Sequence, residues 1–194
     1  MFKKFLVFSV FSVIWCATYE VNLEQSNIHW IGGKITGEDH YGNIGIKKGT
    51  VDINEGFITN SEIVIDMNTI NVTDMNESGN RSLRSHLMNS DFFNIDLFPT
   101  STLVIDSASE FSNNELSLIE GKIRIKDKEI SMQIPMLIVL NNETAIAVGQ
   151  LEIDRTLFGI VYGSGSYFSD LADRAINDNF IIKFSIIANK VSDD

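Results

Sequence analysis

Apolar and polar residues alternate along most of the chain. In the run 130–136, Ile130, Met132, Ile134 and Met136 occupy every second position. Comparable runs lie at 28–32, 51–53, 63–67, 103–105, 119–125, 147–153 and 182–186. A period of two is typical of β-strands with one buried face. About eight such runs, separated by turns rich in Asn, Gly, Asp and Glu, predict an all-β antiparallel barrel or sandwich.

Two stretches depart from this alternation. In 82–89, Leu83 and Leu87 are four residues apart, the spacing of one helix face. In 169–177, Ser169 is a candidate N-cap and is followed by acidic residues. The pattern therefore predicts two short helical insertions between strands.

The segment that follows the first insertion contains adjacent phenylalanines. We expect Phe92 and Phe93 to form an apolar plug at one end of the barrel. Asp91 is expected to cap or tie the turn before them.

The amino terminus is typical of a signal peptide. Lys3 and Lys4 precede an apolar run, 5–15, that is too short to span a bilayer. We therefore expect a signal peptide at 1–17 and one domain at 18–194, with the protein periplasmic or secreted after cleavage. Lipidation of Cys16 is an alternative, but Trp15 stands where a small residue is required. The later apolar runs are too short for stable transmembrane insertion.

Composition narrows the classes of partner. Hydrophobic residues make up 44% of the 194 positions and charged residues 21%, as in ordinary globular domains. The net charge of −11 disfavours nucleic acid and anionic membranes, which need clustered cations. One cysteine excludes an internal disulfide, and the three histidines show no ligand spacing. We expect neither a metal nor a cofactor.

Few residues suggest catalysis. The segment 162–166 is rich in Gly and Ser but is not the Gly-x-Ser-x-Gly elbow, so a close-packed turn or a mouth loop is expected. His86 is a candidate general base without a partner at a supporting spacing. Asp154 and Arg155 are either a structural ion pair or a ligand clamp. We therefore do not expect an enzyme.

The apolar strand faces define the interior. Trp30, Ile65, Leu151 and Phe184 each belong to the apolar phase of a run and are expected to point inward. An eight-stranded barrel either fills its interior with side chains or holds one ligand. Composition leaves both interpretations open.

Several motifs resemble those of the YceI-like family, also called the polyisoprenoid-binding family. They are 28–37 (IHWIGGKITG), 65–70 (IDMNTI), 86–93 (HLMNSDFF) with 98–100 (FPT), 154–160 (DRTLFGI) and 162–168 (YGSGSYF). The resemblance covers about residues 19 to 190. The chain departs from the family pattern at 121–130, where the usual Gly-Val-Thr turn is replaced by a more charged segment.

The resemblance implies a lipocalin-like extended antiparallel eight-stranded β-barrel with a long apolar tunnel and one or two short helical insertions. It also implies binding of a linear isoprenoid or related lipid by an exported bacterial protein. The residues expected in the tunnel wall are Trp30, Ile63, Ile65, Met67, Phe92, Phe93, Leu103, Leu151, Ile153 and Phe184. The residues expected at the rim or head group are His86, Arg155, Tyr162, Ser164 and Phe168.

Three functional hypotheses follow. The leading one is a lipid-binding protein that carries or stores an isoprenoid. The alternatives are a secreted enzyme on a lipid or small apolar substrate using His86, and a structural or stress-related periplasmic protein with a filled barrel. A homodimer is left open.

Overall fold

The computed structural model describes residues 16–192, so the predicted signal peptide lies almost entirely outside the described residues. The chain folds into ten strands, one α-helix and two short 3-10 helices. In order they are β1 (Ala17–Val21), β2 (Asn27–Gly33), β3 (Asp39–Asn54), β4 (Phe57–Val72), α1 (Glu77–Met88), β5 (Thr100–Ile105), β6 (Ser109–Glu110), β7 (Glu115–Ile125), β8 (Lys128–Leu140), β9 (Thr144–Asp154), η1 (Arg155–Phe158), η2 (Ala172–Arg174) and β10 (Asn179–Lys190).

The strands close into an antiparallel barrel. Eight of them follow the order β3-β2-β10-β9-β8-β7-β5-β4, and pairing of β3 with β4 closes the ring. The other two are additions: β6 pairs with the start of β4, and β1 pairs with both β3 and β10. Strand β2 pairs with residues 181–185 of β10, and β1 pairs with residues 188–190 of the same strand. Strands β1 and β2 therefore lie one after the other along one edge of β10. The predicted eight-stranded barrel is confirmed.

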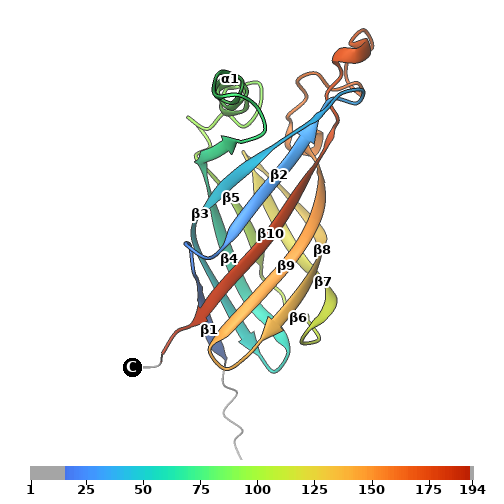
Figure 1. Cartoon of the computed structure of the whole chain (residues 1–194). Coiled ribbons are helices and arrows are strands. Elements are labelled where there is room, and N and C mark those ends of the chain that lie inside the picture. The colour runs from blue at the N-terminus through green and yellow to red at the C-terminus, as the bar shows by residue number, and fades with distance from the viewer. Residues whose placement is uncertain (1–15, 193–194) are drawn as a thin grey trace, which may run out of the picture.

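The two ends of the barrel differ (Figure 1). At the helix end lie α1, the β2–β3 turn and the long connection from η1 to β10. At the hairpin end lie the β3–β4 and β8–β9 hairpins, the start of β1 and the end of β10. Because the two ends are built from different elements, different side chains border the barrel interior at each end.

Strand β9 shows how the alternation of apolar and polar residues places side chains inside and outside the barrel. Leu151 and Ile153 are buried in the core, whereas Val148, Gln150 and Glu152 between and beside them are exposed. Each strand of the ring presents its apolar phase inward in the same way, because successive side chains point to opposite faces of a sheet.

The first helical insertion is longer than expected. Helix α1 begins at Glu77 because the Asn76 side chain accepts a hydrogen bond from the Gly79 N–H, as an N-cap does. Leu87 is buried, as its predicted position on the apolar face requires. The turn after α1 is tied differently from the prediction, since the Asn89 side chain accepts from the Asp91 N–H and Asp91 itself is exposed.

The second insertion is shorter than expected. Only Ala172–Arg174 is helical, and no side chain caps it. The Ser169 hydroxyl donates to the Asp170 side chain instead of capping a helix. A three-residue 3-10 turn is too short to present an apolar face, so this part of the chain is mainly a connecting loop.

Candidate functional site

A cavity of about 610 Å³ occupies the barrel. Its lining reaches from Ile53 and Ile138 near the hairpin end to His86 and Asn177 at the helix end. Close-packed protein cores contain few voids larger than a water molecule, and small-molecule sites span roughly 300–1,000 Å³. The interior is therefore not filled by its own side chains.

The expected wall residues all line this cavity. They are Trp30, Ile63, Ile65, Met67, Phe92, Phe93, Leu103, Leu151, Ile153 and Phe184. Two polar groups of the wall are paired: the Trp30 indole N–H donates to the Asn71 carbonyl over 3.0 Å, and the Ser101 hydroxyl lies 3.1 Å from the Met67 sulfur. The wall thus presents hydrocarbon to whatever occupies the cavity.

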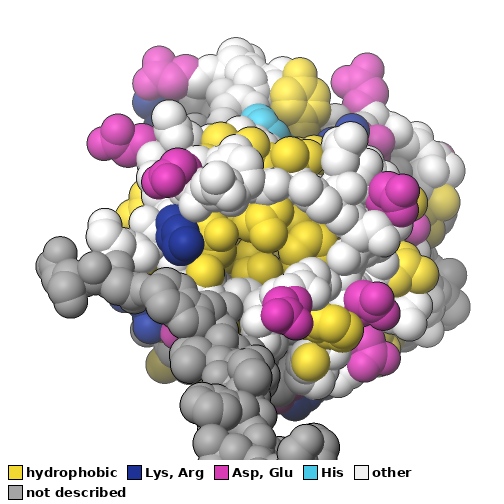
Figure 2. All heavy atoms as spheres, turned by 90° about the horizontal axis from the view of Figure 1, so that it is seen from below, with side chains coloured by type: hydrophobic (Ala, Val, Ile, Leu, Met, Phe, Trp, Pro, Cys, Tyr) yellow, Lys and Arg dark blue, Asp and Glu magenta, His cyan; other side chains and the backbone are white. Residues whose placement is uncertain are grey.

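The hairpin end of the barrel is hollow. Viewed from that end, hydrophobic side chains form the floor of the hollow, and acidic side chains are scattered around it (Figure 2). Val21, Ile58 and Ala188 are among the lining residues contributed by strands at this end. A long apolar chain can therefore extend toward this opening.

An aromatic cluster forms part of the helix end. The His86 ring packs edge-on against Phe92 and Tyr162, with ring centroids 4.9 and 4.7 Å apart. Phe92 is buried and Phe93 half-buried, and both line the cavity. Phe92, Phe93 and His86 thus lie together at the helix end of the cavity, where the plug was expected.

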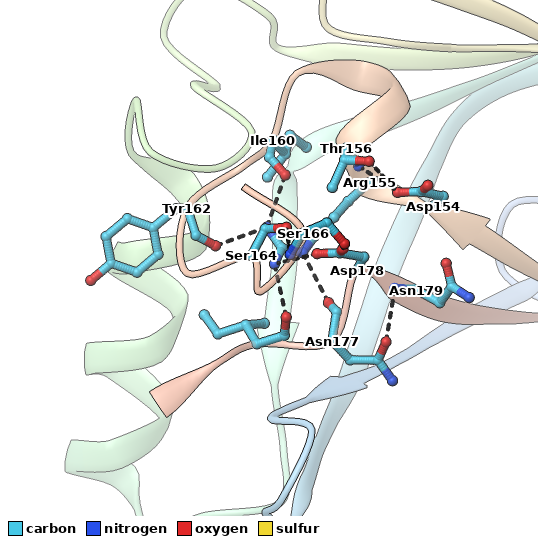
Figure 3. Close-up of polar contacts among 11 residues, drawn as sticks. Asp154, Arg155, Thr156, Ile160, Tyr162, Ser164, Ser166, Asn177, Asp178 and Asn179 are labelled. Carbon is cyan, nitrogen blue, oxygen red and sulfur yellow. Dashed lines mark hydrogen bonds and ion pairs between the residues drawn. The ribbon is translucent and has the colours of Figure 1, made fainter. Parts of the chain in front are cut away.

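Arg155 lies behind this cluster and is almost completely buried. Its Nε donates to the Asn177 carbonyl, and its two terminal nitrogens donate to the carbonyls of Ile160, Tyr162 and Ile176 and to Asp178 (Figure 3). A guanidinium has five N–H groups, so all of them are used. Arg155 lines the cavity, as expected of a rim residue, but its N–H groups are all used to hold the connection from η1 to β10, so the geometry favours the structural alternative over the ligand clamp.

Local features support the clamp. The Asp154 side chain accepts from the Thr156 N–H and hydroxyl and so caps η1. Gly159 ends η1 with φ of 74°, a left-handed conformation that glycine adopts without strain. The partner of Arg155 is thus Asp178, 3.4 Å away, and not the adjacent Asp154.

Burial and charge act in opposite directions on this pair. Burial lowers the pKa of Arg155, and the charges of Asp178 and Asp154 oppose that shift. Burial also raises the pKa of Asp178, but hydrogen bonds from Ser164 and Ser166 and the charge of Arg155 outweigh it, so the pKa is lowered overall. Asp178 is therefore a carboxylate at neutral pH.

The remaining rim candidates are distributed differently from the prediction. Ser164 is completely buried, and its hydroxyl accepts from the Ser166 N–H. Phe168 is about half exposed on the outer loop, and neither residue lines the cavity. Tyr162 is exposed and contacts the site through the rings of His86 and Phe92. The connection folds back onto Ile176, which turns Ser164 into the loop interior.

The helix end carries polar lining residues, of which only Lys34 lies within one of the family-like motifs. They are Lys34, Glu38, His40, Asn177 and Asn179. His40 Nδ1 lies 2.8 Å from a carboxylate oxygen of Asp74, in the segment between β4 and α1. The signal for His40 was present in the sequence, since it shares the inward phase of Gly42 and Ile44, but its partner is 34 residues away.

Within residues 16–192, no three His, Cys, Asp or Glu side chains gather as a metal site. No helix in the same part of the chain is long and apolar enough to cross a membrane.

A closed antiparallel barrel around an apolar cavity defines a lipocalin-like class of protein. The family comparison is more specific. The model of the YceI-like domain matches residues 19–188, so the chain belongs to the YceI-like family. Comparison with curated proteins found no match.

Solved structures share the fold. BcnA of Burkholderia cenocepacia aligns with a TM-score of 0.63 and 19% identity, covering 86% of this chain and 98% of that one. A domain from Saccharophagus degradans, described as polyisoprenoid binding and implicated in plant cell wall breakdown, aligns with a TM-score of 0.61 and 13% identity over 89% and 98% of the two chains. The YceI protein of Campylobacter jejuni aligns with a TM-score of 0.53 and 15% identity over 70% and 74%.

Proposed function

We propose that the protein binds a linear isoprenoid or a similar amphiphilic lipid in the barrel cavity and carries or stores it. The observation that carries the proposal is the apolar cavity of about 610 Å³ that extends between the two ends of the barrel. Membership of the YceI-like family supports it, as does the description of the Saccharophagus degradans domain as polyisoprenoid binding.

The energetics favour a ligand that binds mainly through a hydrocarbon chain. Burial contributes roughly 0.8 kcal/mol per CH₂ group, so one five-carbon isoprene unit contributes on the order of 3–4 kcal/mol before ordering costs. A single hydrogen bond contributes about 1 kcal/mol. Affinity should therefore come from the hydrocarbon, and selectivity from the polar helix end.

The two alternative functions fit the geometry less well. A filled structural barrel does not agree with the cavity of about 610 Å³. A catalytic His86 needs a carboxylate or a nucleophile beside it, but the contacts found for its ring among residues 16–192 are Phe92, Tyr162 and the Asn89 side chain. A binding role is therefore the function we propose.

The cellular location is part of the proposal. A basic start and an apolar run at 1–15 support export to the periplasm or beyond. Mass spectrometry of the purified mature protein would identify its first residue and any lipid on Cys16. Light scattering of the same sample would test the homodimer.

The function is tested by purifying the mature protein without detergent, extracting it and identifying lipids by mass spectrometry. We expect an isoprenoid or a related long-chain lipid in the extract. Repeated recovery of empty protein, combined with failure to take up a fluorescent polyprenyl probe, would contradict the proposal.

A matched pair of variants separates cavity binding from surface adsorption. Ala147 on β9 lines the cavity, whereas its neighbour Val148 is exposed on the outer face. Ala147→Phe should reduce probe uptake strongly because it fills the tunnel, and Val148→Phe should leave uptake unchanged. Equal uptake by both variants would place the probe outside the barrel.

A further inference from the structure

The polar helix end contains a histidine–carboxylate pair that none of the family-like motifs includes. His40 lies at the start of β3, where its side chain lines the cavity and remains about one-third exposed. Asp74 lies between β4 and α1 with its side chain 9% exposed. Their side chains approach to 2.8 Å. The pair therefore joins a cavity-lining ring to a buried acceptor.

Asp74 determines which nitrogen of the His40 imidazole carries a proton and which way the ring is held. Its other carboxylate oxygen accepts from the Tyr41 N–H over 3.1 Å. Burial raises the pKa of Asp74, but the hydrogen bonds from His40 and Tyr41 outweigh this and lower it overall. An ionised carboxylate only accepts, so Nδ1 of His40 carries the proton in this pair. In the neutral ring, Nε2 is then an acceptor.

The Nε2 atom is free to act on a ligand. Among residues 16–192, the hydrogen bond to Asp74 is the one that the His40 ring makes. In its neutral form, the ring offers Nε2 as a hydrogen-bond acceptor near the polar end of the apolar cavity, which suits a ligand group that donates a hydrogen bond. Hydroxyl groups of alcohols and phenols meet that requirement, and ethers do not.

The surrounding charges favour a neutral ligand group. Glu38 lines the same part of the cavity and Asp74 is ionised, while the lining cations are Lys34 and Arg155. Arg155 has no N–H group left for an anion. The whole chain carries a net charge of −11. A phosphate would meet more negative than positive charge at this end.

We propose that the His40–Asp74 pair is the head-group site and that it selects lipids ending in a hydroxyl, with His40 Nε2 accepting the hydroxyl hydrogen. The inference rests on the proposed function, since it places the apolar chain of the same ligand in the tunnel. Asp74 acts here as a positioning residue, because it holds the ring through Nδ1.

The experiment measures Kd for three lipids with the same polyprenyl chain: the alcohol, its methyl ether and its phosphate. The wild-type protein should bind the alcohol about five- to tenfold more tightly than the ether, the ratio that one net hydrogen bond provides. It should bind the phosphate more weakly than the alcohol.

Two variants separate recognition from structure. His40→Asn places a polar atom near Nδ1, so it can keep the contact to Asp74 but has nothing at Nε2. His40→Gln reaches the Nε2 position and loses the Nδ1 contact. We expect His40→Asn to lose the preference for alcohol over ether and His40→Gln to retain part of it. His29→Asn, on the exposed outer phase of β2, is the matched control and should behave as wild type.

The outcomes are distinguishable. Equal binding of alcohol and ether by the wild type would overturn the head-group site and leave the lipid-binding function standing. An unchanged preference in His40→Asn, or tighter binding of the phosphate, would also overturn it. Failure of the wild type to bind any of the three lipids would overturn both the site and the proposed function.

Discussion

Arg155 illustrates how much a single residue contributes to the helix end. Its guanidinium is 5% exposed and donates to four carbonyls and one carboxylate in the connection that links η1 to β10. A buried carbonyl that loses its donor is costly, because water does not replace the bond. The charged side chain of Arg155 therefore has a structural role, although Arg155 lies within one of the family-like motifs.

Replacing this residue should destabilise the protein. Arg155→Met keeps a similar length but leaves the carbonyls and Asp178 without a donor, so we expect a loss of about 3–5 kcal/mol in the free energy of unfolding. Urea denaturation measures it. Arg174→Met, an exposed arginine in the same connection, should change stability by less than about 0.5 kcal/mol. A similar midpoint for Arg155→Met and wild type would contradict the clamp.

The same site predicts a pH dependence. The pKa of Asp178 is lowered in the folded protein from its usual value of 3.8. Its contribution to stability is therefore complete above that value and is lost as the pH falls through the lowered folded-state pKa. Asp178→Asn should be less stable than wild type at pH 7, and the difference should shrink in acid. Urea midpoints at pH 7 and pH 3 test this, and a difference that grows in acid would contradict it.

At the scale of elements, α1 and the turn after it act together as a cover. Leu87 and Phe92 are buried, and the backbone of the turn is held by hydrogen bonds from Phe93 N–H to the Leu87 carbonyl and from Ile95 N–H to the Met88 carbonyl. These bonds fold 89–95 back onto the end of the helix. Phe92 is thereby held against His86 at the cavity.

Truncating the plug should affect stability and binding together. Phe92→Ala is expected to cost about 3–5 kcal/mol, the usual range for a buried phenylalanine. It should also speed release of a bound polyprenyl probe, because it opens the helix end. Leu97→Ala is the control, since Leu97 is 71% exposed in the same connection. Equal release rates for Phe92→Ala and wild type would show that the plug does not retain the ligand.

At the scale of the whole molecule, the two ends have different chemistry. The helix end is polar and partly covered, and the hairpin end is hollow with an apolar floor. A ligand with its polar group at His40 would direct its chain toward the hairpin end. If the chain can pass the apolar floor of the hollow, chain length is limited by the favourable contact along the cavity.

This arrangement predicts a plateau in affinity. In a series of polyprenyl alcohols, Kd should fall as isoprene units are added until the chain fills the tunnel, because each added unit buries more hydrocarbon. Longer chains should then bind with nearly constant affinity, since their excess length leaves through the hairpin end. Competition against a fluorescent polyprenyl probe measures the series. A sharp loss of binding beyond one chain length would indicate a closed cavity.

The sequence by itself determined the strand phases and an antiparallel barrel or sandwich, and its resemblance to the family singled out the barrel. Wall residues such as Ile63, Ile65 and Met67 were predictable because a strand places every second side chain on one face, which is a local rule. The position of α1 and the apolar segment containing Phe92 were also readable locally. The motif resemblance indicated the family, which the match over residues 19–188 confirmed.

Tertiary structure decided the rest. Whether the interior is filled depends on how side chains from all strands meet, and the alternation alone allowed both outcomes. Arg155 was read beside Asp154, but its acceptors lie up to 23 residues further along the chain. His40 was not among the expected site residues, and its partner Asp74 is 34 residues away; Ser164 was placed at the rim although the loop turns it inward. Period and propensity act between neighbours in sequence, whereas hydrogen-bond partners are chosen by chain closure and burial.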